Sequence, residues 1–187
     1  MTRLLVTPPK RVAWFLRPAL WLAKRLTGKD PLPGRLLAHF PKGALGVGVF
    51  EALAASAPRD LDARMLAVAR ITASVVGGCP FCVDMNAATW KKAGLTPSEL
   101  SDLFARRASP SLSAREHLAA RYAQALSSTP IQLDETLTHA LREALSEREL
   151  VVLATTIAQV NFWTRFNQGL GVPAAGFFDE SVCKLPG

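Results

Sequence analysis

The sequence predicts an all-α protein, and three observations lead to this prediction. Ala and Leu dominate a chain of 187 residues in which 49% are hydrophobic and only 7% aromatic, and this composition favours helices. Apolar residues recur at intervals of three or four, and helix-capping patterns precede several of these runs. The sequence shows no βαβ alternation, glycine-rich phosphate loop or internal repeat.

The length is sufficient for one domain with a sizeable core. We expect three parts along the chain: a basic amphipathic N-terminal extension over residues 1–45, a helical domain over 46–172 and an irregular tail over 173–187.

The N-terminal extension carries the positive charge of the protein. Residues 1–42 hold nine Lys or Arg and a single acid, Asp30, so their net charge is +8, whereas the rest of the chain is at −1. Residues 10–26 read as a basic, Trp-containing amphipathic helix with a kink at Pro18. This pattern suits peripheral contact with an anionic membrane, and packing on the domain or on a neighbouring subunit is the alternative. No recognition motif accompanies the charge, so we expect no nucleic acid partner.

The chain then reads as a connector, a helix and a second, longer helix. Residues 28–43 are rich in Pro and Gly and predict a connector. A helix is expected over about 44–56, and Asp60 is the expected N-cap of a helix over about 61–76. The apolar residues of this longer helix recur at helical spacing, which predicts one buried face: Leu61, Met65, Val68, Ile71 and Val75.

The stretch Cys79-Pro80-Phe81-Cys82 contains the most distinctive chemistry of the chain. Because Pro is favoured at the first position of a helix, Cys79 is predicted to be an N-cap, with Cys82 in the first turn of a helix that runs to Gly94. Thiols at the positive end of a helix dipole are expected to have lowered pKa values.

Three later helices begin with the spacing of a capping box, at Thr96–Glu99, Ser113–Glu116 and Ser146–Glu149. The helices expected in this half of the chain cover about 97–106, 114–127, 134–144 and 147–168, the last of them ending at Gly169.

The cysteine pair has several possible uses. A helix precedes it, which disfavours a thioredoxin-like βαβ setting. A structural zinc site needs about four ligands, and the other candidates are scattered singly, so we expect no metal: Cys183, His39, His117 and His139. Redox chemistry and packing as two small apolar side chains remain.

Three cysteines do not make a disulfide framework, and the chain shows no recognisable signal peptide. We therefore expect a cytoplasmic protein. There is no uninterrupted apolar run of the length that a membrane-spanning helix needs.

Two blocks resemble the carboxymuconolactone decarboxylase-like superfamily, in particular its alkylhydroperoxidase D (AhpD)-like C-x-x-C branch. They are residues 69–86 (ARITASVVGGCPFCVDMN) and 157–171 (IAQVNFWTRFNQGLG). The resemblance implies an all-α fold, homo-oligomers and thiol-dependent reduction of a small-molecule hydroperoxide or disulfide, without a cofactor. A second thiol, whose identity the sequence does not disclose, would regenerate the pair.

The same resemblance implies roles for individual residues. Cys82 is the peroxidatic thiol and Cys79 the resolving thiol. The family's proton relay has a His where this chain has Asn86 and a Glu where it has Ala67, and neither Asn nor Ala can act as a general base. Two nearby residues could partly replace the missing relay: Arg70 could stabilise a thiolate, and Asp84 could accept a proton. The alternative for each is that it is simply solvated or forms a salt bridge.

The loss of the relay leaves other functions open. A non-enzymatic or redox-sensing relative is the main alternative to a peroxidase, and the C-x-x-C pair argues against a lactone decarboxylase. Phe81 and Trp90 are expected either to line an apolar pocket suited to an organic hydroperoxide or to be ordinary core residues. Structural roles are expected for three polar residues of the last helix: Asn161, Arg165 and Asn167.

Overall fold

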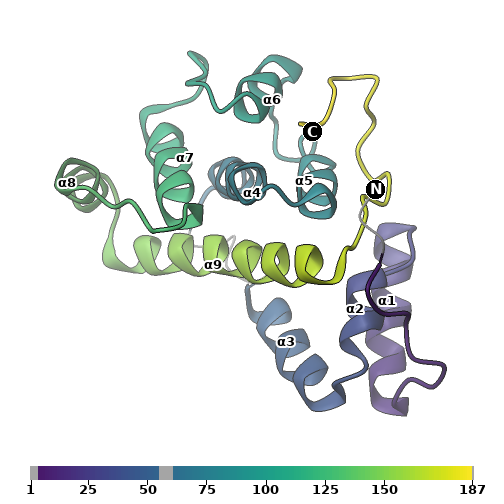
Figure 1. Cartoon of the computed structure of the whole chain (residues 1–187). Coiled ribbons are helices and arrows are strands. Elements are labelled where there is room, and N and C mark those ends of the chain that lie inside the picture. Colours follow the sequence, from purple (N-terminus) through teal and green to yellow (C-terminus); the bar gives the residue numbers. More distant parts are fainter. Residues whose placement is uncertain (1–3, 55–60, 187) are drawn as a thin grey trace.

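The computed structural model describes residues 4–54 and 61–186, and within these ranges it contains helices and no strand (Figure 1). The all-α prediction is confirmed. The elements are the 3₁₀ helix η1 (Trp14–Leu16) and the α-helices α1 (Arg17–Thr27), α2 (Leu32–Leu37), α3 (Pro41–Ala54), α4 (Ala63–Gly77), α5 (Pro80–Ala87), α6 (Pro97–Phe104), α7 (Ala114–Ser127), α8 (Glu135–Ala144) and α9 (Glu147–Leu170).

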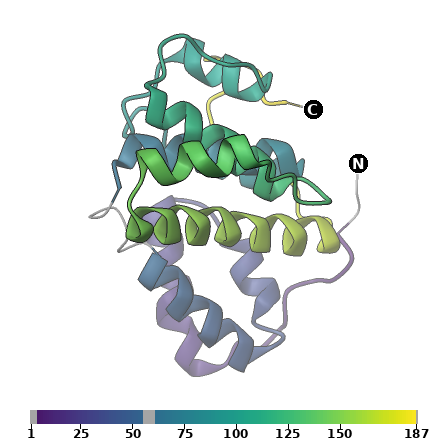
Figure 2. The same ribbon diagram turned by 90° about the vertical axis from the view of Figure 1, so that its left-hand side faces the viewer.

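Helix α4 is the centre of the fold (Figure 1). It packs against α5, α6, α7 and α9, and its predicted apolar face is buried, with Val68 and Ile71 fully inaccessible. Helix α9 runs along one side of this group, and α1, α2 and α3 lie on the opposite side of α9 (Figure 2). The first three α-helices are therefore separated from most of the helical core by a single long helix.

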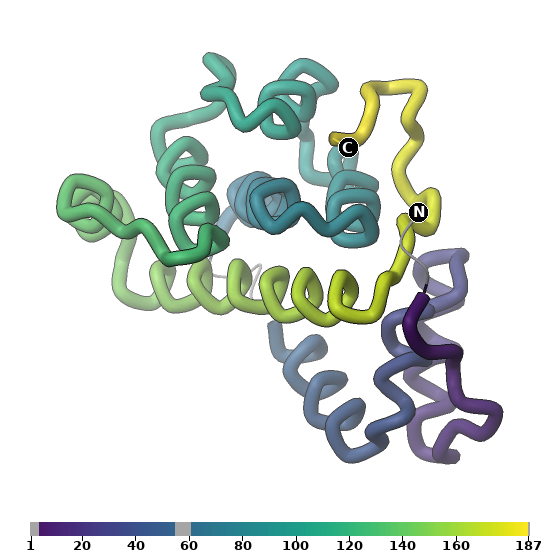
Figure 3. The backbone as a smooth tube through the Cα atoms, viewed as in Figure 1, coloured from purple at the N-terminus to yellow at the C-terminus, as the bar shows by residue number. Residues whose placement is uncertain are grey.

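The N-terminal segment passes beside the end of α9, and the tail that follows α9 turns back toward α5 and α6 (Figure 3). The backbone N–H of Leu5 donates to the carbonyl of Leu170 over 3.0 Å. Beyond Gly171, whose φ of 71° ends α9 in the left-handed conformation, the described tail is irregular.

Helix starts were the most predictable local feature. All three capping boxes form, with the hydroxyl of Thr96, Ser113 or Ser146 accepting from the glutamate N–H three residues later. The N-cap predicted at Asp60 lies outside the described residues, and the structure shows that Asp62 caps α4 by accepting from Arg64 N over 3.2 Å.

Two helix boundaries that were predicted from prolines are wrong. Pro18 lies in the first turn of α1 and does not kink a helix that begins earlier, since Pro is tolerated where its missing N–H has no helical acceptor. The expected connector over 28–43 contains α2 and the start of α3, because Pro33 and Pro41 also lie in the first turns of helices.

The helix that begins after Cys79 is shorter than expected. Helix α5 ends at Ala87, and the chain continues in turns to Gly94. The hydroxyl of Thr89 donates to the Asn86 carbonyl over 2.8 Å, and the N–H of Trp90 bonds to the carbonyl of Ala87. These shorter-range bonds replace the α-helical pattern.

Arg64 ties the helices around α4 together. Its guanidinium donates to Glu116 on α7 over 2.7 Å, to Glu99 on α6 and to the carbonyl of Gly94. The side chains of Glu99 and Glu116 are only 2% and 8% exposed, so one arginine neutralises two buried carboxylates.

The close approach of α4 to α9 depends on Gly77. A Cβ added there would lie 2.5 Å from Cγ2 of Thr164, whereas one added at Gly169 of α9 would have nothing within 4 Å. We expect Gly77→Ala to lower the free energy of unfolding by about 1–3 kcal/mol. The matched Gly169→Ala should raise it by up to about 1 kcal/mol, because Ala is the better helix former. Urea denaturation measures both, and equal effects would contradict the packing argument.

Candidate active site

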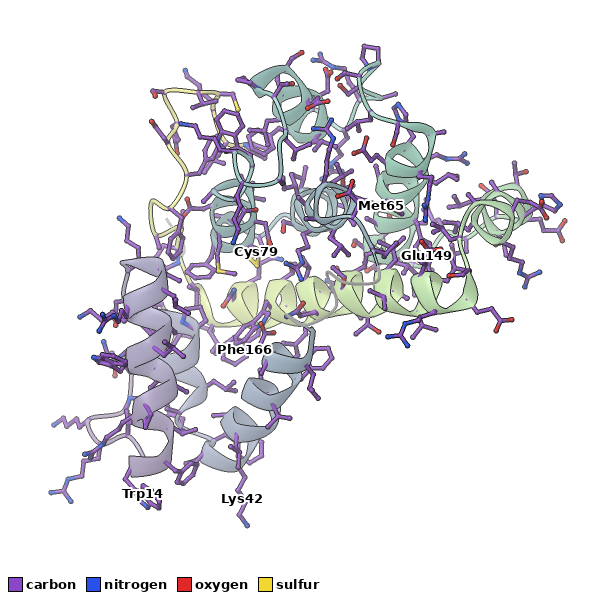
Figure 4. The ribbon with its side chains drawn as sticks, turned by 180° about the vertical axis from the view of Figure 1, so that it is seen from behind. Trp14, Lys42, Met65, Cys79, Glu149 and Phe166 are labelled. Atoms are coloured by element: carbon purple, nitrogen blue, oxygen red, sulfur yellow. A yellow bond between two sulfur atoms is a disulfide. The ribbon has the colours of Figure 1, made fainter. Side chains whose placement is uncertain are left out.

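The two cysteines lie where the sequence predicted, at the start of α5. Cys79 is the N-cap, and its sulfur accepts the N–H of Cys82 over 3.2 Å. The two are joined as a disulfide, with a Cα–Cα distance of 5.2 Å. In Figure 4 Cys79 lies beside α9. Both residues belong to an apolar cluster that also contains Leu36 of α2, so the N-terminal extension packs against the pair.

A cavity of about 290 Å³ opens on Cys82. Cys79 does not line this cavity and is fully buried. The walls come from α1, α2 and α3, from α4, α5 and α9, and from the tail: Leu20, Ala23, Thr27, Pro31, Pro33, Gly34, Glu51, Arg70, Phe81, Cys82, Met85, Asn86, Gln159, Val160, Trp163, Asn167 and Phe177. Of the pair, Cys82 alone therefore lines a space that can hold a small molecule.

Asn86 faces the cavity and is held by two hydrogen bonds. Its Nδ2 donates to Oγ of Ser74 and to the carbonyl of Cys82, each over 2.9 Å. Asn86 therefore lies on the cavity wall one helical turn after Cys82, and its amide has no basic atom for proton transfer.

Arg70 and Glu51 put one positive and one negative group on the cavity wall. Burial lowers the pKa of the Arg70 guanidinium, and the negative charge of Glu51 partly offsets this. Glu51 accepts the indole N–H of Trp163 over 2.7 Å. Within the described residues no carboxylate lies within ion-pair distance of Arg70, so its charge is available to a thiolate or a ligand.

Asn167 is directly against the sulfur of Cys82. Its Nδ2 donates to this sulfur over 3.5 Å, and the residue is 1% exposed. Its Oδ1 is buried and has no hydrogen-bond partner among residues 4–54 and 61–186. A buried unpaired acceptor costs about 1–3 kcal/mol, which a ligand with a donor group would recover.

Asp84 lies away from the cavity. Its carboxylate accepts backbone N–H groups of the tail from Ala175 and Gly176, each over 2.8 Å, and from Phe178 over 2.7 Å. Phe177, held between these anchors, packs edge-on against Phe81 with ring centroids 5.8 Å apart. Asp84 therefore fixes a wall of the cavity and is not among its lining residues.

We expect Asp84→Asn to lower the free energy of unfolding by about 1–3 kcal/mol, because an amide has one neutral acceptor oxygen where the carboxylate has two charged ones. Limited proteolysis should then cut the tail near residues 175–178 sooner. The control is Asp179→Asn, since Asp179 is exposed and its carboxylate accepts the N–H of Ser181 within the tail. A tail equally protected in both variants would contradict this role.

The other residues that the sequence pointed to have structural positions. Trp90 packs into the core cluster around Val83 and does not line the cavity. Asn161 donates to the carbonyl of Leu126 over 3.3 Å, and Arg165 donates to Thr129 Oγ1 over 2.6 Å. Among the described residues no three His, Cys, Asp or Glu side chains group in a way that could hold a metal.

Sequence reasoning did not single out Glu51, and it expected a structural role for Asn167. Glu51 is separated from Trp163 by 112 positions, and Asn167 is separated from Cys82 by 85. Asn167 lies within the family-like block over residues 157–171, and that block was the available signal for a role near the cysteines. No sequence signal marked Glu51, since it precedes both family-like blocks in an apolar helix.

The site is a C-x-x-C disulfide at the N-terminus of helix α5, beside a cavity, in an all-α fold. The sequence pattern of the Carboxymuconolactone decarboxylase family matches residues 47–125. The chain is also 31% identical to the uncharacterized protein YnjA of Escherichia coli K12, over 96% of both chains. It is 30% identical to the uncharacterized protein YdfG of Bacillus subtilis, over 57% of this chain and 73% of that protein. The chain belongs to the Carboxymuconolactone decarboxylase family.

Solved structures share the fold. A cysteine-to-alanine variant of the debrominase Bmp8, in complex with 2,3,4-tribromopyrrole, matches 94% of both chains with a TM-score of 0.81 at 20% identity. ATU0492 of Agrobacterium tumefaciens has unknown function and was suggested to be an antioxidant defence protein AhpD. It matches 74% of this chain and 94% of its own, with a TM-score of 0.67 at 23% identity. The fold of the debrominase therefore extends over the N-terminal extension as well.

Proposed function

We propose that the protein is a thiol-dependent oxidoreductase that reduces small organic hydroperoxides through Cys82 and Cys79. The observation that carries the proposal is the asymmetry of the pair: Cys82 lines the cavity, and Cys79 is buried behind it within disulfide distance. This arrangement suits one sulfur that meets the substrate and a second that resolves the product.

The reaction balances with these two thiols and an external dithiol. The Cys82 thiolate attacks the O–O bond, the terminal oxygen stays on sulfur as a sulfenic acid, and the alcohol leaves after taking up a proton. The thiol of Cys79 then displaces water and forms the disulfide. A dithiol reductant returns both cysteines to thiols and is itself oxidised to a disulfide.

Three cavity residues support this chemistry in place of the missing relay. The cationic Arg70 stabilises a thiolate at Cys82, and the Nδ2 of Asn167 donates to the same sulfur. The carboxylate of Glu51, on the cavity wall, is a group that can take up or release the proton. The walls are otherwise mostly apolar, which favours an organic substrate over hydrogen peroxide.

The decisive experiment treats the reduced Cys183→Ser protein with one equivalent of cumene hydroperoxide. We expect two thiols to disappear and the Cys79–Cys82 disulfide to form for each hydroperoxide consumed. Retention of both thiols while the peroxide persists would refute the proposal and leave the sensor or packing alternatives.

Reductive dehalogenation is a second candidate, favoured by the match to the debrominase over 94% of both chains. A dithiol can convert an aryl bromide to the arene and bromide ion while it becomes a disulfide. Incubation of the reduced protein with a brominated pyrrole, with release of bromide as the readout, separates this activity from peroxide reduction.

Arg70→Met is expected to raise the pKa of the Cys82 thiol by about one unit, because it removes a positive charge from a cavity of low polarity. The pH dependence of alkylation of the reduced protein measures this value. The control is Arg121→Met, which removes an exposed positive charge outside the cavity. An unchanged titration in Arg70→Met would remove Arg70 from the site's chemistry.

We also propose that the protein acts in the cytoplasm as a homo-oligomer. Helix α3 is predominantly apolar, yet Leu45, Val49 and Phe50 are exposed, and such a helix is normally buried. A second copy of the chain is a suitable cover. Sedimentation velocity of the protein and of Val49→Asp tests this, and a monomeric wild type would exclude it.

A further inference from the structure

We propose that the protein docks on anionic membranes through a basic-apolar surface formed by η1, α1 and the segment before them. We define this surface by residues that are all exposed: Lys10, Arg11, Trp14, Phe15, Trp21, Leu22, Lys24, Arg25 and Leu26. None of the helices in the described ranges is long and apolar enough to cross a membrane, so the contact would be peripheral.

The first argument is the weak burial of α1. None of its eleven residues is buried, although a helix this short is marginal in water without tertiary contacts. Its large apolar side chains face outward, with Trp21 60% exposed and Leu26 77% exposed, and Trp14 of η1 is 79% exposed. In Figure 4 Trp14 lies at the outer end of α1, away from the helical core.

The second argument is the charge of this surface, which favours an anionic bilayer over a second copy of the chain as the binding partner. Lys24 and Arg25 lie among these apolar side chains, and the Arg25 guanidinium lies 5.3 Å from the centre of the Trp21 ring. The single acid of residues 1–42, Asp30, is paired with Arg35. Two copies meeting through this surface would bring like charges together, whereas an anionic bilayer accepts both the cations and the aromatic rings.

The third argument connects this surface to the cavity. The opposite face of α1 supplies Leu20, Ala23 and Thr27 to the wall of the cavity that contains Cys82. Docking through α1 would therefore place the cavity directly behind the docked helix, one helix away from the lipid surface. This points to a substrate class, amphiphilic hydroperoxides held in the bilayer, and that part of the inference rests on the proposed function.

The test is co-sedimentation of the full chain with vesicles of phosphatidylglycerol and phosphatidylcholine, and with vesicles of phosphatidylcholine alone. We expect binding that needs the anionic lipid and weakens as salt is raised. The double variant Lys24→Gln with Arg25→Gln should weaken vesicle binding about 30-fold, because each cation contributes a factor of about five. The matched control is Lys91→Gln with Lys92→Gln, since this exposed pair also places a cation near a Trp ring.

A second pair of variants tests the apolar part. Trp14→Ser with Trp21→Ser should weaken vesicle binding at least about tenfold, whereas Ile131→Ser with Val151→Ser, which are also exposed, should not. The inference is overturned if the wild type does not bind anionic vesicles, or if the Trp14/Trp21 and Ile131/Val151 double variants bind them equally well. It is also overturned if a concentration-dependent dimer is lost in the Trp variant, since a second copy would then cover the surface.

Activity assays separate the docking from the chemistry. The Lys24 and Arg25 variant should lose rate on a lipid hydroperoxide embedded in vesicles and keep its rate on water-soluble tert-butyl hydroperoxide. Vesicle binding without any peroxide activity would refute the proposed function and leave the docking intact. Equal loss on both substrates would overturn the link between this surface and the substrate.

Discussion

Cys82→Ser is expected to lower kcat/KM for an organic hydroperoxide by at least about 10³-fold, because serine cannot replace the thiolate as nucleophile. Cys82 is the cysteine that lines the cavity. Stopped-flow mixing of the reduced protein with cumene hydroperoxide measures the loss.

Cys79→Ser is the matched variant, and its expected behaviour differs. The sulfur of Cys79 is fully buried and does not reach the cavity, so the first attack by Cys82 should persist. Without a resolving thiol the protein should consume one equivalent of hydroperoxide and then stop with Cys82 as a sulfenic acid. If the two variants behave alike, or if Cys79→Ser is the one that loses the first step, the assignment of the two sulfurs is wrong.

Arg64→Met is expected to have the largest effect on stability, about 3–5 kcal/mol in the free energy of unfolding. Removing this arginine leaves the buried carboxylates of Glu99 and Glu116 without their cation. Urea denaturation at neutral pH measures the loss.

The control for this variant is Arg115→Met. Arg115 also pairs with a glutamate of a capping box, Glu149, over 2.5 Å, but the side chains are 49% and 23% exposed. An exposed ion pair contributes at most about 1 kcal/mol. A similar loss in both variants would mean that burial is not the cause.

The pH dependence provides an independent check. Burial by itself raises the pKa of Glu99, but hydrogen bonds from Arg64, Thr96 and Ser111 outweigh it and bring the value to about 2, from 4.5. The lowered pKa means that the unfolded chain takes up the proton first as pH falls. The resulting stabilisation, about 3 kcal/mol, is present above pH 4.5 and is lost between about pH 4.5 and 2.

We therefore expect the wild type to lose stability across this range. The difference in stability between the wild type and Arg64→Met should become smaller as Glu99 becomes protonated in both proteins. Thermal unfolding followed by circular dichroism between pH 2 and 5 measures the difference at each pH. A difference that stays constant down to pH 2 would contradict the assignment.

Local chemistry accounts for the parts of the fold that were predictable. A capping hydroxyl and a glutamate three residues later satisfy each other within one turn, so Thr96, Ser113 and Ser146 marked helix starts without reference to the rest of the chain. The position of Cys79 as N-cap followed from Pro80 in the same way. Pro18 and Pro33 were misplaced because a proline can end one helix or begin another, and the flanking contacts decide which.

The sequence by itself determined the all-α fold, the three helix starts marked by capping boxes and the place of the cysteine pair at the positive end of α5, because these depend on neighbours within a few residues. Only the tertiary structure decided which sulfur meets the cavity and what surrounds it. Asn167 reaches Cys82 across 85 positions, and Glu51 of α3 reaches Trp163 across 112. It also decided that Asp84 holds the tail. Contacts at such separations arise from the packing of whole helices, and no local pattern encodes them.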